Sequence, residues 1–209
     1  MLGLARLGEF STAWYRSRID SEVPGLQYAL IDCDFARINR YLPDNFEGLA
    51  PLLAQLVAAA EGAGVTQLLL PNITLHHAFW QYPAWQGDIV LFDPFEMLDG
   101  LIGLREVFVL GTRHTQSSDI LRRRLRERGI DLRMVNDEQV ARVDAIRQAI
   151  YRDGCSEALR EALGALVEKL VAECPVLIAC SELSIALGES SEGVVDLASL
   201  QIAAFLKAG

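Results

Sequence analysis

Short apolar runs alternate along the chain with longer stretches in which apolar residues recur at helical spacing. The longer stretches predict helices over residues 11–23, 47–61, 116–128, 137–152, 157–173 and 198–207. The short runs predict strands over residues 2–5, 27–32, 66–70, 88–92, 106–110, 131–135, 175–179 and 193–196. Apolar strands separated by helices are typical of a parallel sheet covered on both faces. The pattern therefore predicts an α/β fold.

The negative net charge of the chain disfavours negatively charged binding partners. A formal net charge of −9 argues against nucleic acids and anionic membranes, because both attract positively charged surfaces. The basic run RRRLRER lies within a predicted helix and is interpreted as its solvated face. No run reaches the roughly 18 apolar residues of a membrane span, and the first residues lack the order of a signal peptide. We therefore expect a cytoplasmic protein.

The cysteines indicate neither a metal site nor a disulfide framework. Cys33, Cys155, Cys174 and Cys180 show no CxxC spacing, so reduced thiols are expected. The chain also contains no Gly-x-Gly-x-x-Gly turn and no phosphate-binding Gly-Lys loop. The expectation is a protein that works without a cofactor or a bound metal.

Polar turns directly follow several predicted strands, where α/β sheets usually bind their ligands. In GTRHTQSSD, Gly111 allows close backbone approach, and Thr112 and Thr115 lead into a helix. Free N–H groups and hydroxyls at a helix start can bind an anion. The same hydroxyls can simply cap the helix. Both interpretations stay open for this turn.

A second turn, ACSEL, places Cys180 just past a buried strand, with Ser181 and Glu182 beginning the next helix. The dipole at a helix N-terminus favours a thiolate, which a nucleophile or a carbon-acid base requires. Glu182 could hold a proton or a substrate ammonium group. A buried, inert cysteine is the alternative reading of the same residues.

A third turn, PNITLHH, offers Asn72 and Thr74 as hydrogen-bond donors and His76 as a candidate acid or base. His77 is interpreted as pointing outward, and a packed or solvated role is the ordinary outcome for a lone histidine. Asp196, at the end of the last predicted strand, is expected to cap the final helix or to contact a ligand.

Together these segments resemble the cofactor-independent aspartate/glutamate racemase family. The similarity runs nearly end to end, and its most specific part is LGTRHTQSSDILRRRLRERGID. The other matching segments are STAWYRSRID, DCDFARI, PNITLH, ACSEL and VVDLASLQIAA. ACSEL stands where the family has Gly-Cys-Thr-Glu-Leu, and PNITLH stands where it has Cys-Asn-Thr-x-His.

The resemblance implies two pseudo-symmetric Rossmann-like lobes with parallel sheets and an active site in the cleft between them. One lobe would comprise residues 1–102 and 192–209, and the other residues 103–191. In the family, two cysteines flank the α-carbon of a small amino-acid or carboxylic-acid substrate, and one removes the proton that the other returns. Members often form dimers, so a homodimer is also an expectation.

Carried onto this chain, the resemblance makes Cys180 the principal acid/base, Glu182 the residue that tunes it, and His76 the candidate for the opposite face of the substrate. The residues expected to bind the substrate carboxylates and ammonium group are Ser11, Thr12, Asn72, Thr74, Thr112, Thr115 and Ser181.

Several positions depart from the family pattern. Asn72 replaces the first catalytic cysteine, and Ile73 replaces the asparagine that follows it. Arg6 lies where the family has glycines and could either bind a carboxylate or block the pocket. Gln201 replaces a histidine that is common in the closing helix.

Because an asparagine side chain cannot exchange a proton near neutral pH, three outcomes stay open. Racemisation could use His76, or a water held by Asn72 and Thr74, on the second face. Cys180 could instead act alone as a stereospecific proton donor, as in the related arylmalonate decarboxylases. The fold could also bind a ligand without turnover. The residues favour the first outcome.

Overall fold

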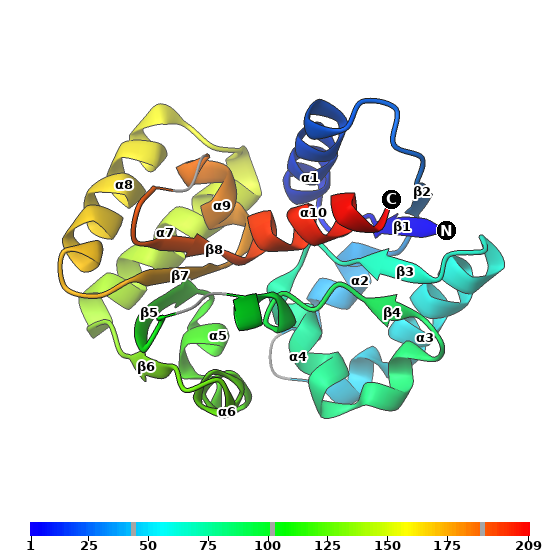
Figure 1. Cartoon of the computed structure of the whole chain (residues 1–209), viewed down its shortest axis with the longest axis horizontal. Helices are drawn as coiled ribbons and strands as arrows, with labels where there is room; N and C mark the ends of the chain where they lie inside the picture. Colours follow the sequence, from blue (N-terminus) through cyan, green and yellow to red (C-terminus); the bar gives the residue numbers. More distant parts are fainter. Residues whose placement is uncertain (43–44, 101–102, 189–190) are drawn as a thin grey trace. The chain divides into compact units, whose positions relative to one another are not determined.

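The computed structural model describes residues 1–42, 45–100, 103–188 and 191–209 (Figure 1). The chain divides into two compact units, Met1–Asp93 with Leu200–Gly209 (unit 1) and Pro94–Ser199 (unit 2). The lobe boundary expected at residue 102 lies outside the described residues. None of the described helices is long and apolar enough to cross a membrane.

Each unit contains one parallel sheet. In unit 1 the strand order is β2-β1-β3-β4, and in unit 2 it is β6-β5-β7-β8. The strands are β1 (Leu2–Ala5), β2 (Ala29–Ile31), β3 (Gln67–Leu69), β4 (Val90–Leu91), β5 (Glu106–Gly111), β6 (Asp131–Arg133), β7 (Val176–Ala179) and β8 (Val194–Asp196). Every predicted strand is present, and the α/β prediction is confirmed.

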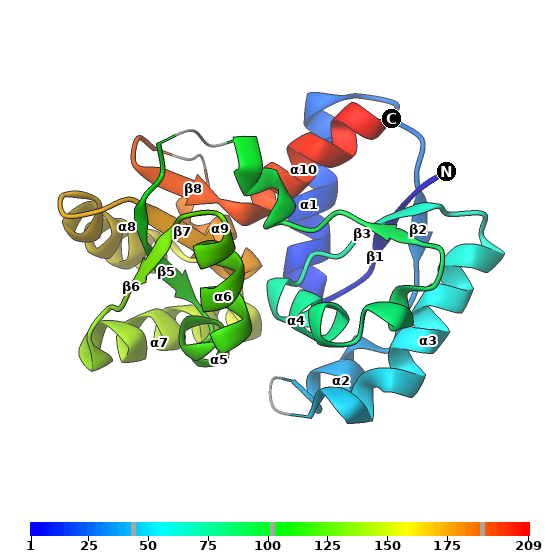
Figure 2. The same ribbon diagram turned by 60° about the horizontal axis from the view of Figure 1, so that its bottom comes forward.

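Helices pack against each sheet, as the two views of the ribbon show for α3 in unit 1 and α7 in unit 2 (Figures 1 and 2). The α-helices are α1 (Glu9–Glu22), α2 (Phe35–Asn39), α3 (Phe46–Gly62), α4 (Ile73–Gln81), α5 (Arg113–Ser117), α6 (Asp119–Glu127), α7 (Asp137–Asp153), α8 (Glu157–Val171), α9 (Ser181–Leu187) and α10 (Leu197–Ala208). Short 3-10 helices span Pro83–Gln86 (η1) and Glu96–Gly100 (η2).

The structure corrects one predicted helix and adds others. Residues 116–128 do not form a continuous helix, because Ser118 adopts an extended backbone (φ −67°, ψ 119°) between α5 and α6. Its hydroxyl accepts a hydrogen bond from the Leu121 N–H at 3.2 Å, so Ser118 caps the second helix.

The hydrophobic periodicity of the sequence did not predict α2 and α4. Residues Ile73 to Phe79 of α4 are all buried, so this helix has no polar face to reveal it.

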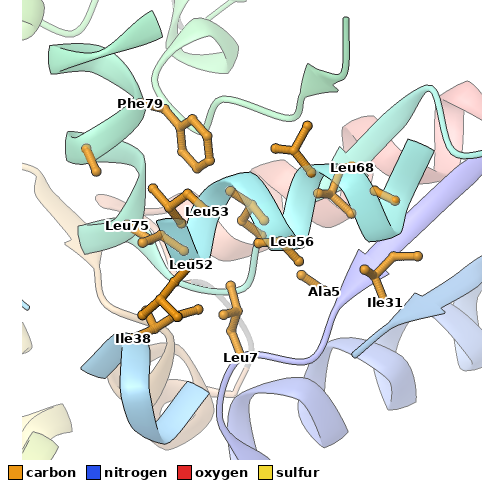
Figure 3. Packing of buried hydrophobic residues seen from close by; sticks show 14 of the residues in the cluster. Ala5, Leu7, Ile31, Ile38, Leu52, Leu53, Leu56, Leu68, Leu75 and Phe79 are labelled. Atoms are coloured by element: carbon orange, nitrogen blue, oxygen red, sulfur yellow. The ribbon is translucent and has the colours of Figure 1, made fainter. Parts of the chain in front are cut away.

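The core of unit 1 forms around α3. Asn45 begins this helix by accepting a hydrogen bond from the Gly48 N–H, and the apolar face that follows packs onto the sheet. Figure 3 shows Leu52, Leu53 and Leu56 of this face among buried side chains from the strands and from α2 and α4. The labelled partners are Ala5, Leu7, Ile31, Ile38, Leu68, Leu75 and Phe79.

In unit 2 the core lies between the sheet and the pair α7 and α8. Asn136 and Gln139 form a capping box that begins α7, because each side chain accepts a hydrogen bond from the other residue's backbone N–H. Ile146 and Leu166 contribute to the buried cluster over Val176 and Ile178 of β7. This packing supports β7, the strand that leads directly to Cys180.

The packing in unit 1 predicts the effect of shortening one core side chain. Leu53 is fully buried, so Leu53→Ala should destabilise the protein by about 2–5 kcal/mol. Gln55→Ala, on the exposed face of the same helix, should change stability by no more than about 0.5 kcal/mol. Urea denaturation followed by circular dichroism measures both. Equal midpoints for the two variants would contradict the packing.

Candidate active site

Cys180 lies directly after β7 and occupies the N-cap position of α9. Its thiol donates a hydrogen bond to Oε2 of Glu182 at 3.0 Å, and the Ser181 hydroxyl lies 3.4 Å from the same oxygen. Only 5% of the Cys180 surface is exposed. The turn therefore combines a buried thiol with a carboxylate that can accept its proton.

The environment of Cys180 favours the thiol over the thiolate. Burial raises its pKa well above the ordinary cysteine value, and the charge and hydrogen bond of Glu182 raise it further. The positive charge of Arg147 acts in the opposite direction, although more weakly. These effects oppose the dipole-stabilised thiolate that the sequence of the turn suggested.

The Thr112 turn lies beside the Cys180 turn because β5 pairs with β7. The parallel register places Gly111 opposite Ala179, the residue before Cys180. A Cβ atom at Gly111 would lie 3.0 Å from the Ala179 carbonyl oxygen, so only glycine allows this approach without a shift. Thr112 Oγ1 accepts a hydrogen bond from the Thr115 N–H at 3.1 Å and contacts the Thr115 hydroxyl at 2.9 Å. The Thr112 side chain thus caps α5.

Sequence reasoning missed Gln116 in this turn. Its side-chain amide nitrogen donates to the Gly111 carbonyl at 2.9 Å, while its buried Oε1 has no hydrogen-bond partner among the described residues. The position follows Thr115 within a polar stretch, so nothing in the local sequence distinguishes it from a solvent-exposed helix residue.

Asp196 links α9 to the start of α10 through hydrogen bonds. Its carboxylate accepts hydrogen bonds at 2.6 Å from the hydroxyls of Ser184 and Ser199, and it also accepts from the Ala198 and Ser199 N–H groups. It therefore caps α10, as expected, and burial raises its pKa. Ser184, which no sequence motif singled out, also lies 3.2 Å from the Cys180 carbonyl oxygen.

In unit 1, Asn72 is the N-cap of α4, and its Oδ1 accepts a hydrogen bond from the Leu75 N–H at 2.9 Å. Thr74 and His76 follow in the same helix and are buried. His77 does not point outward as interpreted from the sequence: it is fully buried, with its ring centroid 4.7 Å from that of Trp80. All residues of α4 from Ile73 to Phe79 are buried, which leaves no exposed side for His77.

The first predicted helix of unit 1 places Ser11 and Thr12 in buried positions. The Thr12 hydroxyl has no hydrogen-bond partner within the described part of the chain.

Arg6 forms an exposed ion pair with Asp32 at 2.7 Å, a type of contact worth about 0–1 kcal/mol. Cys33 donates to the Arg6 carbonyl, and burial, with smaller effects of two aspartates, raises its pKa to about 11.

The described residues contain no group of three His, Cys, Asp or Glu side chains that could hold a metal ion. The functional groups gathered in unit 2 are a thiol, a carboxylate and hydroxyls. Such groups can transfer a proton and hold an anionic substrate by hydrogen bonds.

A family model described as Asp/Glu/Hydantoin racemase matches residues 95–204. The chain belongs to this family. The matched segment contains Thr112, Cys180 and Asp196, whereas the Asn72 turn lies before it. The resemblance inferred from the sequence motifs is confirmed at the level of the family.

Solved structures of racemases share the fold of this chain. An aspartate racemase homologue from Pyrococcus horikoshii is 21% identical, with a TM-score of 0.75 over 99% of this chain and 97% of that chain. The Picrophilus torridus aspartate racemase is 18% identical, with a TM-score of 0.76 over 100% and 93%. A glutamate racemase from Thermus thermophilus, in complex with β-chloro-D-alanine, is 17% identical, with a TM-score of 0.65 over 99% and 79%. No curated protein sequence matches the chain.

The contact between Cys180 and Glu182 predicts a measurable change in thiol ionisation. Because the Glu182 charge raises the pKa of Cys180, Glu182→Gln should lower that pKa and produce thiolate at a less alkaline pH. Thiolate absorbance in the ultraviolet, taken as the difference from Cys180→Ala, measures this. Glu168→Gln removes an equal charge from an exposed position on α8 and should leave the titration unchanged. Identical titrations for Glu182→Gln and the unmodified protein would refute the coupling.

Proposed function

We propose that this protein is a pyridoxal-phosphate-independent amino-acid racemase that transfers a proton at the α-carbon of an aspartate- or glutamate-like substrate. The observation that carries the proposal is the hydrogen bond from the buried Cys180 thiol to Glu182. Membership of the Asp/Glu/hydantoin racemase family supports a small amino acid as the substrate. The names of the aspartate and glutamate racemases that share the fold agree with this class.

In the proposed reaction, Cys180 first passes its proton to Oε2 of Glu182. The thiolate then removes the α-hydrogen: an S–H bond forms as the C–H bond breaks, and the electron pair moves onto the substrate carboxylate. In reverse, the thiol protonates the carbanion, and Glu182 returns its proton to sulfur. Each proton is accounted for at a named atom, and the substrate's own carboxylate takes the electron pair, so no oxidant is required.

The developing negative charge on the substrate carboxylate needs hydrogen-bond donors. Thr112, Thr115 and Ser181 are proposed to supply them together with nearby backbone N–H groups. The capping role of Thr112 uses its oxygen only as an acceptor. Its own proton is available to the substrate when Thr115 is the donor in the contact between the two hydroxyls. Substrate binding by Ser11, Thr12, Asn72 and Thr74 stays a prediction, as do a homodimer and a cytoplasmic location.

Racemisation also needs a proton donor for the opposite face of the α-carbon. Asn72 cannot be that donor, because an amide N–H is too weak an acid to act as a general acid near neutral pH. His76, or a water held by Asn72 and Thr74, stays the prediction for this role.

A second candidate function is stereospecific proton donation by Cys180 alone, as a decarboxylase of malonate-type acids would need. The raised pKa of Cys180 favours it, because the resting thiol is already in the donor form.

Exchange of the α-proton in deuterated water tests the proposed function. Aspartate and glutamate enantiomers should incorporate deuterium, and Cys180→Ala should slow incorporation by about 10²–10⁴-fold through loss of the acid/base. Cys155→Ala removes a thiol that is distant in sequence from these turns and should retain exchange. Mass spectrometry with chiral chromatography reports both the label and the configuration.

The configuration of the labelled product separates the candidates. Inversion with label supports racemisation, and retention supports a single working thiol. Asn72→Cys should increase inversion if it restores a second thiol at the substrate. Absence of exchange in the unmodified protein, despite measurable binding of these amino acids, would contradict enzymatic proton transfer to this substrate class.

A further inference from the structure

We infer that Gln201 is a positioning residue that holds His76 as a neutral imidazole, with its proton on Nδ1 and its Nε2 engaged as an acceptor. The tautomer of His76 is inferred from the hydrogen bonds alone, and only its consequence for proton transfer rests on the proposed function. Tyr15, His76 and Gln201 come from α1, α4 and α10, and together with the Phe92 carbonyl they form one hydrogen-bonded group in unit 1. The three side chains are at most 1% exposed.

The Phe92 carbonyl fixes the orientation of the Gln201 amide. A carbonyl oxygen can only accept, so the atom that faces it at 2.7 Å must be the amide nitrogen Nε2. Oε1 then faces the Tyr15 hydroxyl, which donates to it at 2.9 Å. Reversing the amide would place two acceptors 2.7 Å apart in a region that water does not reach, and unmade buried hydrogen bonds are costly.

The fixed amide in turn determines which nitrogen of His76 carries the proton. Nε2 of Gln201 has two N–H groups; one serves Phe92, and the other points to Nε2 of His76 at 3.1 Å. Because an amide N–H can only donate, the imidazole Nε2 must accept and cannot carry a proton. An imidazolium would set two N–H donors against each other inside this buried group.

This arrangement changes the role of His76 in the proposed reaction. To deliver or collect a proton through Nε2, the ring would have to break its contact with Gln201. In this state His76 is a neutral hydrogen-bonding group that joins α4 to α10, and its Nε2 cannot serve as the second proton donor while the contact with Gln201 holds. Any proton that His76 supplies in the proposed reaction must therefore come from Nδ1.

Nitrogen NMR of the full-length protein with ¹⁵N-labelled histidine tests the inference without any substrate. The His76 signals are assigned by their loss in His76→Gln. The unmodified protein should show an unprotonated Nε2 and a protonated Nδ1. In Gln201→Glu, an oxygen lone pair replaces the N–H that faces His76, so Nε2 should become protonated and its resonance should shift strongly upfield.

Tyr15→Phe is the matched control, because it removes a hydrogen bond from the same group but leaves Phe92 to orient the Gln201 amide. Its His76 tautomer should match that of the unmodified protein. A protonated Nε2 in the unmodified protein would overturn the inference, and so would an unchanged tautomer in folded Gln201→Glu. If Gln201→Glu does not fold, the spectrum of the unmodified protein still decides. The spectrum does not depend on turnover, so its outcome is separate from the exchange experiment on Cys180.

Discussion

Parallel pairing of β5 with β7 is the constraint on which the chemistry of unit 2 depends. The register sets Gly111 against Ala179, and the missing side chain of Gly111 allows the two backbones to approach. Both strands end at the same edge of the sheet, so the turns that follow are neighbours, although they are far apart in the sequence. One turn carries the hydroxyls of Thr112 and Thr115, and the other carries Cys180 and Glu182.

The chemistry of Cys180 results from a balance between burial and charge. A helix start favours a thiolate, but α9 has only 7 residues, and the thiol is buried. Burial and the adjacent Glu182 therefore prevail, and the pKa of the thiol rises. In the proposed reaction, the same carboxylate that accepts a hydrogen bond from the thiol also receives its proton. Under that proposal Glu182 connects the thiol form of Cys180 to its thiolate form.

The sequence predicted the strands well, because each is a short apolar run between polar turns, and it predicted the family from the motifs in those turns. It predicted less well where burial is complete. In α4, His77 could not be placed from periodicity because every residue from Ile73 to Phe79 is buried. The break at Ser118 depends on a local cap that competes with a continuous helical pattern. The contacts of Gln201 with Tyr15 and Phe92 join distant segments, and no local motif encodes them.

We propose that Cys180 is the thiol that acts on the substrate. Methyl methanethiolsulfonate, a small thiol reagent, tests it directly when α-proton exchange and the modification of each cysteine are followed together by peptide mass spectrometry. The rate of α-proton exchange should fall in proportion to the fraction of Cys180 that the reagent converts to its methyl disulfide. Saturating aspartate or glutamate should slow both the modification and the loss of exchange. Reducing the disulfide should restore the free thiol and the exchange rate together. Full exchange activity in protein whose Cys180 is completely modified would contradict the claim.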